Sequence, residues 1–273
     1  LSLRQRRAKA MTPILQFGTS RFLQAHVDLF ISQAMAQGQA LGPITVVQSS
    51  GDPGRSRRLA ALAAPGGFTV RVRGRDGGQT VDTAVTVTSV VRALSTATDW
   101  PEVRRIAVQE AQIILSNSAD AGYAPQPADT GAHFDQAMSW PAKLTVLLRA
   151  RFEGGGRPVQ VMPTELVTDN GRVLRARVLE LAQGDAFRAW LATRVTWVNS
   201  LVDRIVSEPL DPAGAVTEPY ALWAIEDQPG LILPCRHPAI QVVADLRPTE
   251  ALKLFILNLG HTFLAQRWLD QAA

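Results

Sequence analysis

Short apolar segments alternate with longer segments of helical spacing along the first two hundred residues. The apolar runs stop at Gly, Ser, Gln or Pro, and the segments between them repeat apolar positions every three or four residues. The predicted strands are 14–17, 44–47, 113–115 and 159–162, and the predicted helices are 21–35, 55–64, 100–109, 142–152, 172–182 and 186–193. This alternation predicts a mostly parallel α/β sheet covered by helices, with ligands bound at the carboxyl ends of the strands.

Three segments depart from that alternation. Residues 68–73 and 81–91 alternate apolar and polar positions around a Gly-rich turn, which predicts a hairpin inserted in the sheet. Residues 195–205 are predicted to form one further strand. Beyond Val206 seven prolines interrupt the chain before an amphipathic helical run at 249–272. We therefore expect a domain boundary near Val206.

The net charge of +4 has a local origin. Four of the 28 basic residues lie in the first ten positions, which contain no acid: Arg4, Arg6, Arg7 and Lys9. Without them the charges balance at 24 of each sign, so we expect no nucleic-acid partner.

No apolar run approaches the ~20 residues of a membrane span, and the one cysteine, Cys235, has no partner for an internal disulfide. We expect a cytoplasmic protein without a membrane segment or metal site, in which His26 packs within the fold.

Lysine is rare in this chain and its positions are informative. Beside 25 arginines there are three lysines: Lys9, Lys143 and Lys253. Lysine, unlike arginine, can lose its proton at working pH, and Lys253 lies within an apolar helical run. At about 100° per residue, Glu250, Lys253, Asn258 and His261 fall within an arc of about 140° on one helix. Such a face could move the proton of an alcohol, although an exposed polar face has the same spacing.

The turn after the first predicted strand is a candidate phosphate site. Gly18 starts it, and a following helix would direct backbone N–H groups toward a pyrophosphate. The turn departs from G-x-G-x-x-G at two glycine positions, where it has Ser20 and Leu23, so a βα turn without a ligand is an alternative. The second strand ends in Gln48-Ser49-Ser50 instead of an acid that binds the ribose of NAD, and Arg55, Arg57 and Arg58 follow. The choice between NAD and NADP therefore stays open.

The spacing Lys-x4-Asn-x2-His at 253–261 resembles the catalytic signature of the mannitol dehydrogenase family, the polyol-specific long-chain dehydrogenases that include the hexuronate reductases. Further segments resemble this family in the same order along the chain: Gln16 to Gly18, Arg21 to His26, Leu115 to Ser118, Glu165-Leu166, Asp169 to Gly171, Asn199 to Ile205, and Glu218 to Tyr220 with Trp223. The resemblance extends from about Ile14 to Trp268.

The resemblance implies a metal-independent NAD(P)-dependent oxidoreductase that interconverts a secondary alcohol and a ketone on a linear sugar acid or polyol. After the basic N-terminal arm at 1–13, it implies a Rossmann-like dinucleotide-binding domain at 14–206, up to the expected boundary, and at 207–273 the beginning of a mainly α-helical substrate domain. NAD is the expected cofactor, with NADP left open. Leu166 stands where mannitol dehydrogenases carry an oxyanion-binding Asn, so the chain is most similar to the tagaturonate and fructuronate reductase branch. A hexuronate or aldonate such as tagaturonate or altronate is therefore favoured.

The same resemblance implies roles for individual residues. Lys253 would be the general acid and base, Asn258 and His261 would polarise the reacting carbonyl, and Glu250 would line the proton path to water. The implied substrate-binding residues are Asp203, Glu165 and Arg204. The implied cofactor-binding residues are Gly18, Ser20, Arg21, Phe22, Ser49 and Asn117.

Two alternatives accompany this interpretation. One is a mannitol or polyol 2-dehydrogenase. The other is a truncated, non-catalytic nucleotide-binding remnant, because the family continues with a long helical domain and this sequence stops at Ala273. In the second case the apolar helix at 251–269 would need a cover from another chain, so self-association through it is expected, with a small molecule as the other partner.

Overall fold

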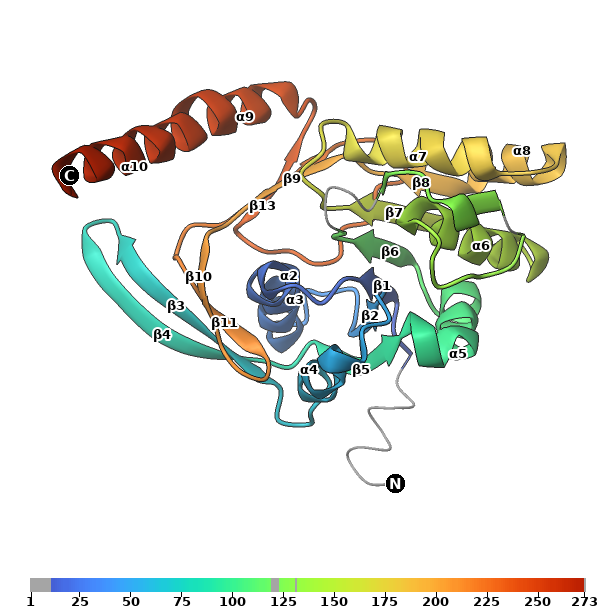
Figure 1. Cartoon of the computed structure of the whole chain (residues 1–273), viewed down its shortest axis with the longest axis horizontal. Coiled ribbons are helices and arrows are strands. Elements are labelled where there is room, and N and C mark those ends of the chain that lie inside the picture. The colour runs from blue at the N-terminus through green and yellow to red at the C-terminus, as the bar shows by residue number, and fades with distance from the viewer. Residues whose placement is uncertain (1–10, 119–122, 131, 273) are drawn as a thin grey trace.

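The central element of the molecule is a six-stranded sheet in which every strand is parallel to its neighbours (Figure 1). The computed structural model describes residues 11–118, 123–130 and 132–272. The strand order is β5 (Val90–Ser95), β2 (Ile44–Gln48), β1 (Ile14–Phe17), β6 (Ile113–Ser116), β7 (Val159–Pro163), β8 (Val195–Trp197). In order of their appearance along the chain this is 3-2-1-4-5-6, the dinucleotide-binding arrangement. The predicted Rossmann-like α/β class is confirmed.

Helices cover both faces of this sheet. One face carries α2 (Arg21–Ala25), α3 (Val27–Ala36) and α4 (Ser56–Leu62), and the other carries α5 (Thr96–Gln109), α6 (Trp140–Glu153), α7 (Asn170–Leu181) and α8 (Asp185–Arg194). Two hydrophobic cores result, because successive strand side chains point to opposite faces. Ile14 belongs to the first core and Leu15 to the second, and both are fully buried.

The predicted helix over 21–35 is in fact two helices, α2 and α3, separated at His26. His26 has non-helical backbone angles, φ −121° and ψ −91°, and its Nε2 donates a hydrogen bond to the Leu222 carbonyl at 2.9 Å. The Ala25 carbonyl accepts from Arg204 Nη1 at 2.6 Å instead of continuing a helical ladder. The prediction that His26 packs within the fold is confirmed. Its buried ring packs against three aromatic side chains: Phe22, Phe30 and Trp223.

The predicted insertion of a hairpin into the parallel sheet is wrong. The hairpin exists, as β3 (Phe68–Asp76) and β4 (Gln79–Val87), but it belongs to a separate four-stranded sheet with β10 (Val206–Pro209) and β11 (Gly214–Thr217). β3 pairs in parallel with β11, which lies far along the chain, and this pairing leaves no mark on the local sequence pattern. Figure 1 shows the long curved hairpin extending away from the parallel strands.

The predicted strand over 195–205 is also divided. β8 ends at Trp197, and β9 (Ser200–Asp203) pairs in a third sheet of order β13-β12-β9, with β12 (Leu222–Glu226) and β13 (Ile240–Val243). Asn199 occupies the break: its Oδ1 accepts from the Arg172 backbone N–H at 3.1 Å and its Nδ2 donates to Glu226 at 2.6 Å. The first bond gives the Arg172 N–H, in the first turn of α7, a hydrogen-bond acceptor. The second holds Asn199 at the point where the chain leaves the parallel sheet for the third sheet.

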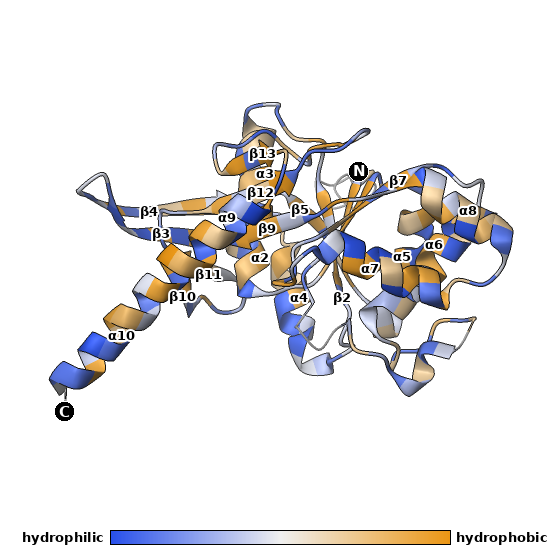
Figure 2. Cartoon of the chain, turned by 90° about the horizontal axis from the view of Figure 1, so that it is seen from above, coloured by the Kyte–Doolittle hydropathy of each residue, from blue (hydrophilic) through white to orange (hydrophobic). Residues whose placement is uncertain are grey.

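Residues 247–272 form one continuous helical rod, which extends the predicted helix over 249–272 by two residues. It consists of α9 (Arg247–Leu252), a π turn (Lys253–Asn258) and α10 (Leu259–Ala272). Figure 2 shows the rod projecting from the body with apolar positions along its length.

The segment before the rod is made of strands: β11, β12 and β13 lie within residues 207–243. The division into two domains at Val206 stays a prediction. The first ten residues of the predicted basic arm lie outside the described residues. Among the described helices, none is long and apolar enough to cross a membrane.

Candidate functional site

A cavity of about 670 Å³ opens at the carboxyl ends of β1, β2 and β6. The strand order reverses between β1 and β6, which is the place where open α/β sheets bind their ligands. Four of the six predicted cofactor-binding residues line this cavity: Gly18, Ser20, Ser49 and Asn117. The structure therefore brings together residues that are up to 99 positions apart in the sequence.

The turn after β1 is held in place by close packing and hydrogen bonds. Gly18 has φ +124°, and a Cβ atom there would lie 2.8 Å from the Asn117 carbonyl oxygen. The Ser20 hydroxyl accepts from the Leu23 backbone N–H at 3.2 Å and donates to Asn117 Oδ1 at 3.3 Å. Asn117 Nδ2 donates to the Thr164 carbonyl at 2.9 Å. Because these bonds join the ends of three neighbouring strands, the wall of the cavity is preformed.

The two remaining cofactor candidates face other parts of the chain. Arg21 Nη1 donates to the Gly214 carbonyl at 3.0 Å, which attaches α2 to β11. The Phe22 ring stacks on His26 with centroids 4.8 Å apart. Neither side chain is among the described residues that line the cavity, and their contact with a cofactor stays a prediction.

Sequence reasoning missed Lys143 as a residue of this site. It lies in the first turn of α6, is only 5% exposed, and donates a hydrogen bond of 3.0 Å from Nζ to the Ser49 carbonyl. Burial lowers the pKa of this lysine, and it lines the cavity together with Arg58. The usable signal was its rarity, because the chain retains lysine at only three positions.

Glu165 lies inside the protein, where its carboxylate joins the loops after β6 and β7. One oxygen accepts from the Ser118 backbone N–H at 2.8 Å and from the Ser118 hydroxyl at 3.0 Å. The other accepts from the Ser116 and Tyr123 hydroxyls, each at 3.1 Å. Burial raises the pKa of Glu165. Four donors from the chain already occupy this carboxylate, while the neighbouring Leu166 is 67% exposed.

The Lys253 amine is attached to the end of β9. Its Nζ donates to the Val202 carbonyl at 2.8 Å and lies 3.3 Å from Asp203 Oδ1, and the side chain is 14% exposed. The start of β9 is in turn fixed to the end of β7, because the Ser200 hydroxyl donates to the Pro163 carbonyl at 2.6 Å. The amine is thus largely shielded from solvent, on a strand joined to the carboxyl edge of the parallel sheet.

The π turn changes the arrangement of the predicted catalytic face. In a π-helix the hydrogen bonds join residues five apart, so Lys253 and Asn258 stand one turn apart on the same side. A regular α-helix would separate them by about 140°. Asn258 and His261 are exposed, and within residues 247–272 neither side chain has a hydrogen bond. Burial raises the pKa of Glu250, with a further contribution from the Asp169 carboxylate.

Arg204, a predicted substrate-binding residue, is bonded to backbone carbonyls. Besides Ala25, it donates from Nη2 to the Glu218 carbonyl at 2.8 Å, and it is 9% exposed. Burial lowers the pKa of this guanidinium to about 10. The structure therefore places Arg204 between α2 and the segment before Tyr220, next to Asp203, and its contact with a substrate stays a prediction.

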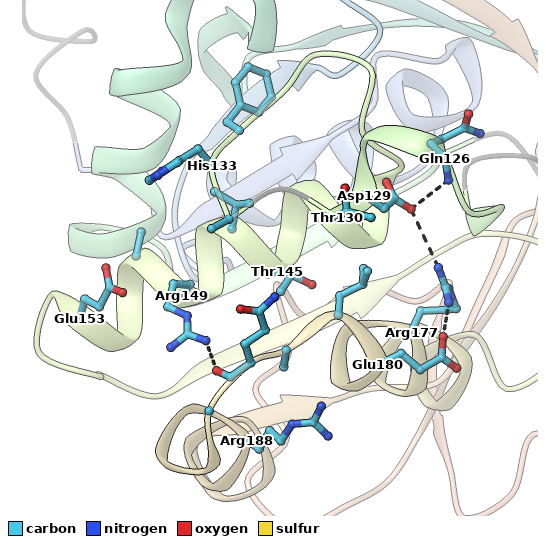
Figure 3. A pocket seen from close by; sticks show the side chains of 18 of the residues that line it. Gln126, Asp129, Thr130, His133, Thr145, Arg149, Glu153, Arg177, Glu180 and Arg188 are labelled. Carbon is cyan, nitrogen blue, oxygen red and sulfur yellow. Dashed lines mark hydrogen bonds and ion pairs between the residues drawn. The ribbon is translucent and has the colours of Figure 1, made fainter.

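A second, larger cavity of about 1700 Å³ is lined by residues of α5, α6, α7 and α8, and Gln126 lines both cavities (Figure 3). Three of its charged side chains form ion pairs: Arg177 lies 3.9 Å from Asp129 and also contacts Glu180. None of the predicted site residues that the structure describes lines it. The described part of the chain also groups no three His, Cys, Asp or Glu side chains as metal ligands.

Comparisons with known proteins agree with this geometry. The model of the mannitol dehydrogenase Rossmann domain matches residues 12–232. An altronate oxidoreductase of Bacillus subtilis (strain 168) is 30% identical over 277 residues, which is 91% of this chain and 57% of that protein. An altronate oxidoreductase of Klebsiella pneumoniae (strain 342) is 30% identical over 92% of this chain and 57% of its own length. The chain spans less than two thirds of the length of these relatives.

Two solved structures share the fold. A D-sorbitol dehydrogenase in substrate-free form superposes with a TM-score of 0.75 at 20% identity, over 93% of this chain and 58% of that chain. The mannitol 2-dehydrogenase of Pseudomonas fluorescens, in a ternary complex with NAD and D-mannitol, superposes with a TM-score of 0.73 at 20% identity. That match covers 90% of this chain and 56% of the other.

Proposed function

The chain belongs to the mannitol dehydrogenase family, and on this basis we propose that it is a metal-independent NAD(P)-dependent oxidoreductase. It interconverts a secondary alcohol and a ketone on a linear sugar acid or polyol. The principal support is the cavity where the strand order reverses, lined by Gly18, Ser20 and Asn117, on a sheet whose carboxyl edge is joined to the strand that holds Lys253. The donors in this cavity fit a dinucleotide, because they combine hydroxyls with three cationic side chains.

A bound nicotinamide accepts or donates the hydride. The side chains of this protein transfer the proton between the substrate hydroxyl and water. In the oxidation direction Lys253 takes the proton of the substrate hydroxyl as the carbon loses its hydride, and in reduction it returns that proton to the oxygen. Asn258 and His261 donate hydrogen bonds to the same oxygen, and Glu250 passes the proton to water. Val202 and Asp203 hold the amine in position for this transfer.

The favoured substrate is a hexuronate or aldonate such as tagaturonate or altronate. The altronate oxidoreductases among the relatives and the Glu165-Leu166 pair support this choice. Leu166 is exposed and apolar, so it brings no hydrogen-bond donor to an alcohol oxygen. A mannitol or polyol 2-dehydrogenase is the alternative, with support from the likeness to the mannitol enzyme of Pseudomonas fluorescens.

The test measures reduced nicotinamide by absorbance after altronate or mannitol is mixed with the oxidised cofactor. We expect turnover with altronate, and a loss of about 100-fold or more in Lys253→Ala, the range assigned to general acid–base catalysis. Lys253→Arg keeps the charge but cannot release the proton, so it should be equally impaired. Gln266→Ala, on an exposed part of α10, should match the parent. Turnover in Lys253→Ala equal to the parent rate would contradict the proposal.

A second candidate function is nucleotide binding without turnover. It is favoured by the exposure of Asn258 and His261, whose side chains have no hydrogen bond among the described residues. In that case calorimetry would detect binding of the dinucleotide, while no sugar acid or polyol would be oxidised. Calorimetry of dinucleotide binding and the absorbance assay of turnover therefore separate the two candidate functions.

We also propose that the chain associates with a second copy through its C-terminal rod. Large apolar side chains on the rod are exposed to solvent: Phe263 is 62% and Trp268 is 68% exposed. Exposed apolar surfaces of this extent favour association. Light scattering should show a dimer that Phe263→Ser converts to a monomer, whereas a monomeric parent chain would refute the proposal.

A cytoplasmic location completes the proposal. Cys235 is buried and free, and burial raises the pKa of its thiol to about 12, so the thiol is inert and compatible with a reducing compartment. Fractionation of cells that produce the protein should recover it with cytoplasmic markers, and recovery in another fraction would contradict this location.

A further inference from the structure

The side chain of Asn170 is buried at the start of α7 and uses all of its hydrogen-bonding groups within the protein. Its Nδ2 donates to the Ser200 carbonyl at 2.7 Å and to the Glu165 carbonyl at 3.0 Å. Its Oδ1 accepts from the Ser200 backbone N–H at 3.0 Å and from the Gly171 backbone N–H at 2.9 Å. An asparagine amide has two N–H donors and two acceptor lone pairs, so none is left for a ligand. The amide therefore serves to join segments of the chain.

Two of these four bonds go to both backbone groups of Ser200, the first residue of β9, and together they form a two-point clamp. β9 is the strand whose Val202 carbonyl accepts from the Lys253 amine and whose Asp203 carboxylate lies 3.3 Å from that amine. Hydrogen bonds weaken steeply when their angles change, so a clamp on both groups of one residue fixes its orientation as well as its distance. Asn170 therefore sets where the strand that holds the Lys253 amine begins.

The bond from Asn170 to the Glu165 carbonyl reaches the wall of the cofactor cavity. The Glu165 carboxylate accepts from the Ser116 hydroxyl at the end of β6 and from the backbone N–H of Ser118. Ser118 and its neighbour Asn117 both line the cavity. One amide thus connects the wall of the proposed dinucleotide cavity with the strand that holds the proposed general acid and base.

The backbone around Asn170 has the shape that this contact requires. Asp169 has φ +54° and is the one non-glycine residue with a left-handed φ within the described ranges, a conformation that costs free energy. Gly171 packs directly on the chain before β9, and a Cβ atom there would overlap the Val198 carbonyl oxygen. The starts of α7 and β9 are therefore in contact, which brings the Asn170 amide within reach of Ser200.

We propose that Asn170 is a positioning residue: its clamp on Ser200 holds the Lys253 amine at the correct place relative to the wall of the cofactor cavity. This inference rests on the proposed function, since it assumes that Lys253 moves the substrate proton. Proton transfer requires an amine within hydrogen-bond reach of the substrate oxygen. A displacement of about 1 Å can slow such a step by about 100-fold. Asn170 acts only through β9, because its own hydrogen bonds are all made within the chain.

The first test measures how accessible the Lys253 amine is to a small reagent. The chain contains three lysines, so acetylation by acetic anhydride at one pH, followed by mass spectrometry, resolves each of them. Asn170→Ala removes the clamp, and we expect Lys253 to react about tenfold faster than in the parent chain. Lys143, which is bonded to the Ser49 carbonyl, is the internal control and should react at an unchanged rate. This measurement needs neither cofactor nor turnover.

Gln160 provides a matched control variant. Like Asn170 it is 1% exposed, and its amide clamps both backbone groups of Ile232: Nε2 donates to the carbonyl and Oε1 accepts from the N–H, each at 2.8 Å. It lies near the start of β7, whereas Asn170 follows the end of that strand. Gln160→Ala should therefore also lower the thermal unfolding temperature, but Lys253 should react in it at the parent rate.

The second test measures turnover and cofactor affinity. In Asn170→Ala we expect kcat to fall by about tenfold to 100-fold. The dissociation constant of NADH, measured by its fluorescence, should stay at the parent value, because Asn170 does not line the cavity. Gln160→Ala should keep the parent kcat. Ser200→Ala removes only the hydroxyl bond to the Pro163 carbonyl, and it carries both tests if Asn170→Ala does not fold, with an expected change of about threefold in each rate.

The outcomes separate this inference from the proposed function. If Lys253 reacts at the parent rate in Asn170→Ala, if Gln160→Ala exposes it equally, or if Asn170→Ala keeps the parent kcat, the positioning role is wrong and the proposed function stands. If the parent chain shows no turnover, the proposed function is overturned, and the acetylation rates alone decide whether Asn170 positions the amine.

Discussion

The Lys253 ammonium and the Asp203 carboxylate lie 3.3 Å apart, where the C-terminal rod meets the end of β9. Both side chains are more than four-fifths covered, at 14% and 18% exposure, so the pair is less screened than a surface salt bridge. With the bond from Lys253 to the Val202 carbonyl, it attaches the rod to the sheet that supports the proposed active site.

Asp203→Asn should loosen this attachment. The variant keeps the shape of the side chain but removes the charge, and an ion pair of this kind contributes about 1 kcal/mol. Hydrogen exchange of residues 247–258 should therefore become about threefold to tenfold faster, while exchange in β1 and β6 stays unchanged. Asp227→Asn, at an exposed position, is the control. Equal exchange in the rod of both variants would contradict the proposed attachment.

Glu165→Gln should destabilise the protein. The carboxylate accepts four hydrogen bonds that join the loops after β6 and β7, and an amide nitrogen accepts none. We expect the free energy of unfolding in urea to fall by about 2 kcal/mol. Tyr123→Phe removes only one of the donors and should cost about half as much. A larger loss in Tyr123→Phe than in Glu165→Gln would show that the carboxylate does not organise these loops.

Gly18→Ala should close the cavity wall and strain the turn. The left-handed φ of +124° excludes an L side chain, and the new methyl group would meet both the Asn117 carbonyl oxygen and the Leu23 side chain within 3 Å. The expected loss is about 2 kcal/mol of stability, together with a loss of NADH or NADPH fluorescence enhancement. Gly38→Ala also has a left-handed φ but open space around it, so it should lose about 1 kcal/mol and bind nucleotide normally. Normal binding in Gly18→Ala would argue against this turn as the phosphate site.

The stability of the protein should depend on the ionisation of Asp28. Burial raises the pKa of this carboxyl from 3.8 to about 7, and its Oδ1 has no hydrogen-bond partner among the described residues. The folded chain therefore binds this proton more tightly than the unfolded chain does. The contribution of Asp28 to the free energy of unfolding is greatest at about pH 4 and decreases as the pH rises to about 7.

Asp28→Asn has no such proton to lose. Its stability relative to the parent should rise between about pH 4 and pH 7, by on the order of 3 kcal/mol. Burial lowers the pKa of His26 to about 3, which weakens the fold as the pH falls, but this effect is common to both proteins and cancels in the difference. Urea unfolding at a series of pH values provides the measurement, and parallel curves for the two proteins would refute the assignment.

The local pattern of apolar and polar residues was sufficient to predict the strands of the parallel sheet and the helices that cover it. The apolar runs that became β1, β2, β6 and β7 were predicted to within one residue at each end, because a strand buried on both faces is a short uninterrupted apolar segment. The turn at Gly18 was also identified, since it follows such a run directly, whereas Asn117 was identified through the resemblance to the family. The rarity of lysine singled out Lys253.

The remaining features depend on contacts between residues far apart in the sequence. β3 and β4 left the main sheet because β11 pairs with β3, and the helix over 21–35 divided because Arg204 and Leu222 bond to Ala25 and His26. Lys143 became a cavity residue only because α6 places its amine on the Ser49 carbonyl.

The sequence by itself determined which segments are strands or helices and which residue types stand at strand ends, because spacing along the chain sets which side chains share a face. Only the tertiary structure decided which of these faces meet. It placed the Lys143 amine on the Ser49 carbonyl and covered the Lys253 amine, since each result depends on the distance between groups that the chain brings together by folding.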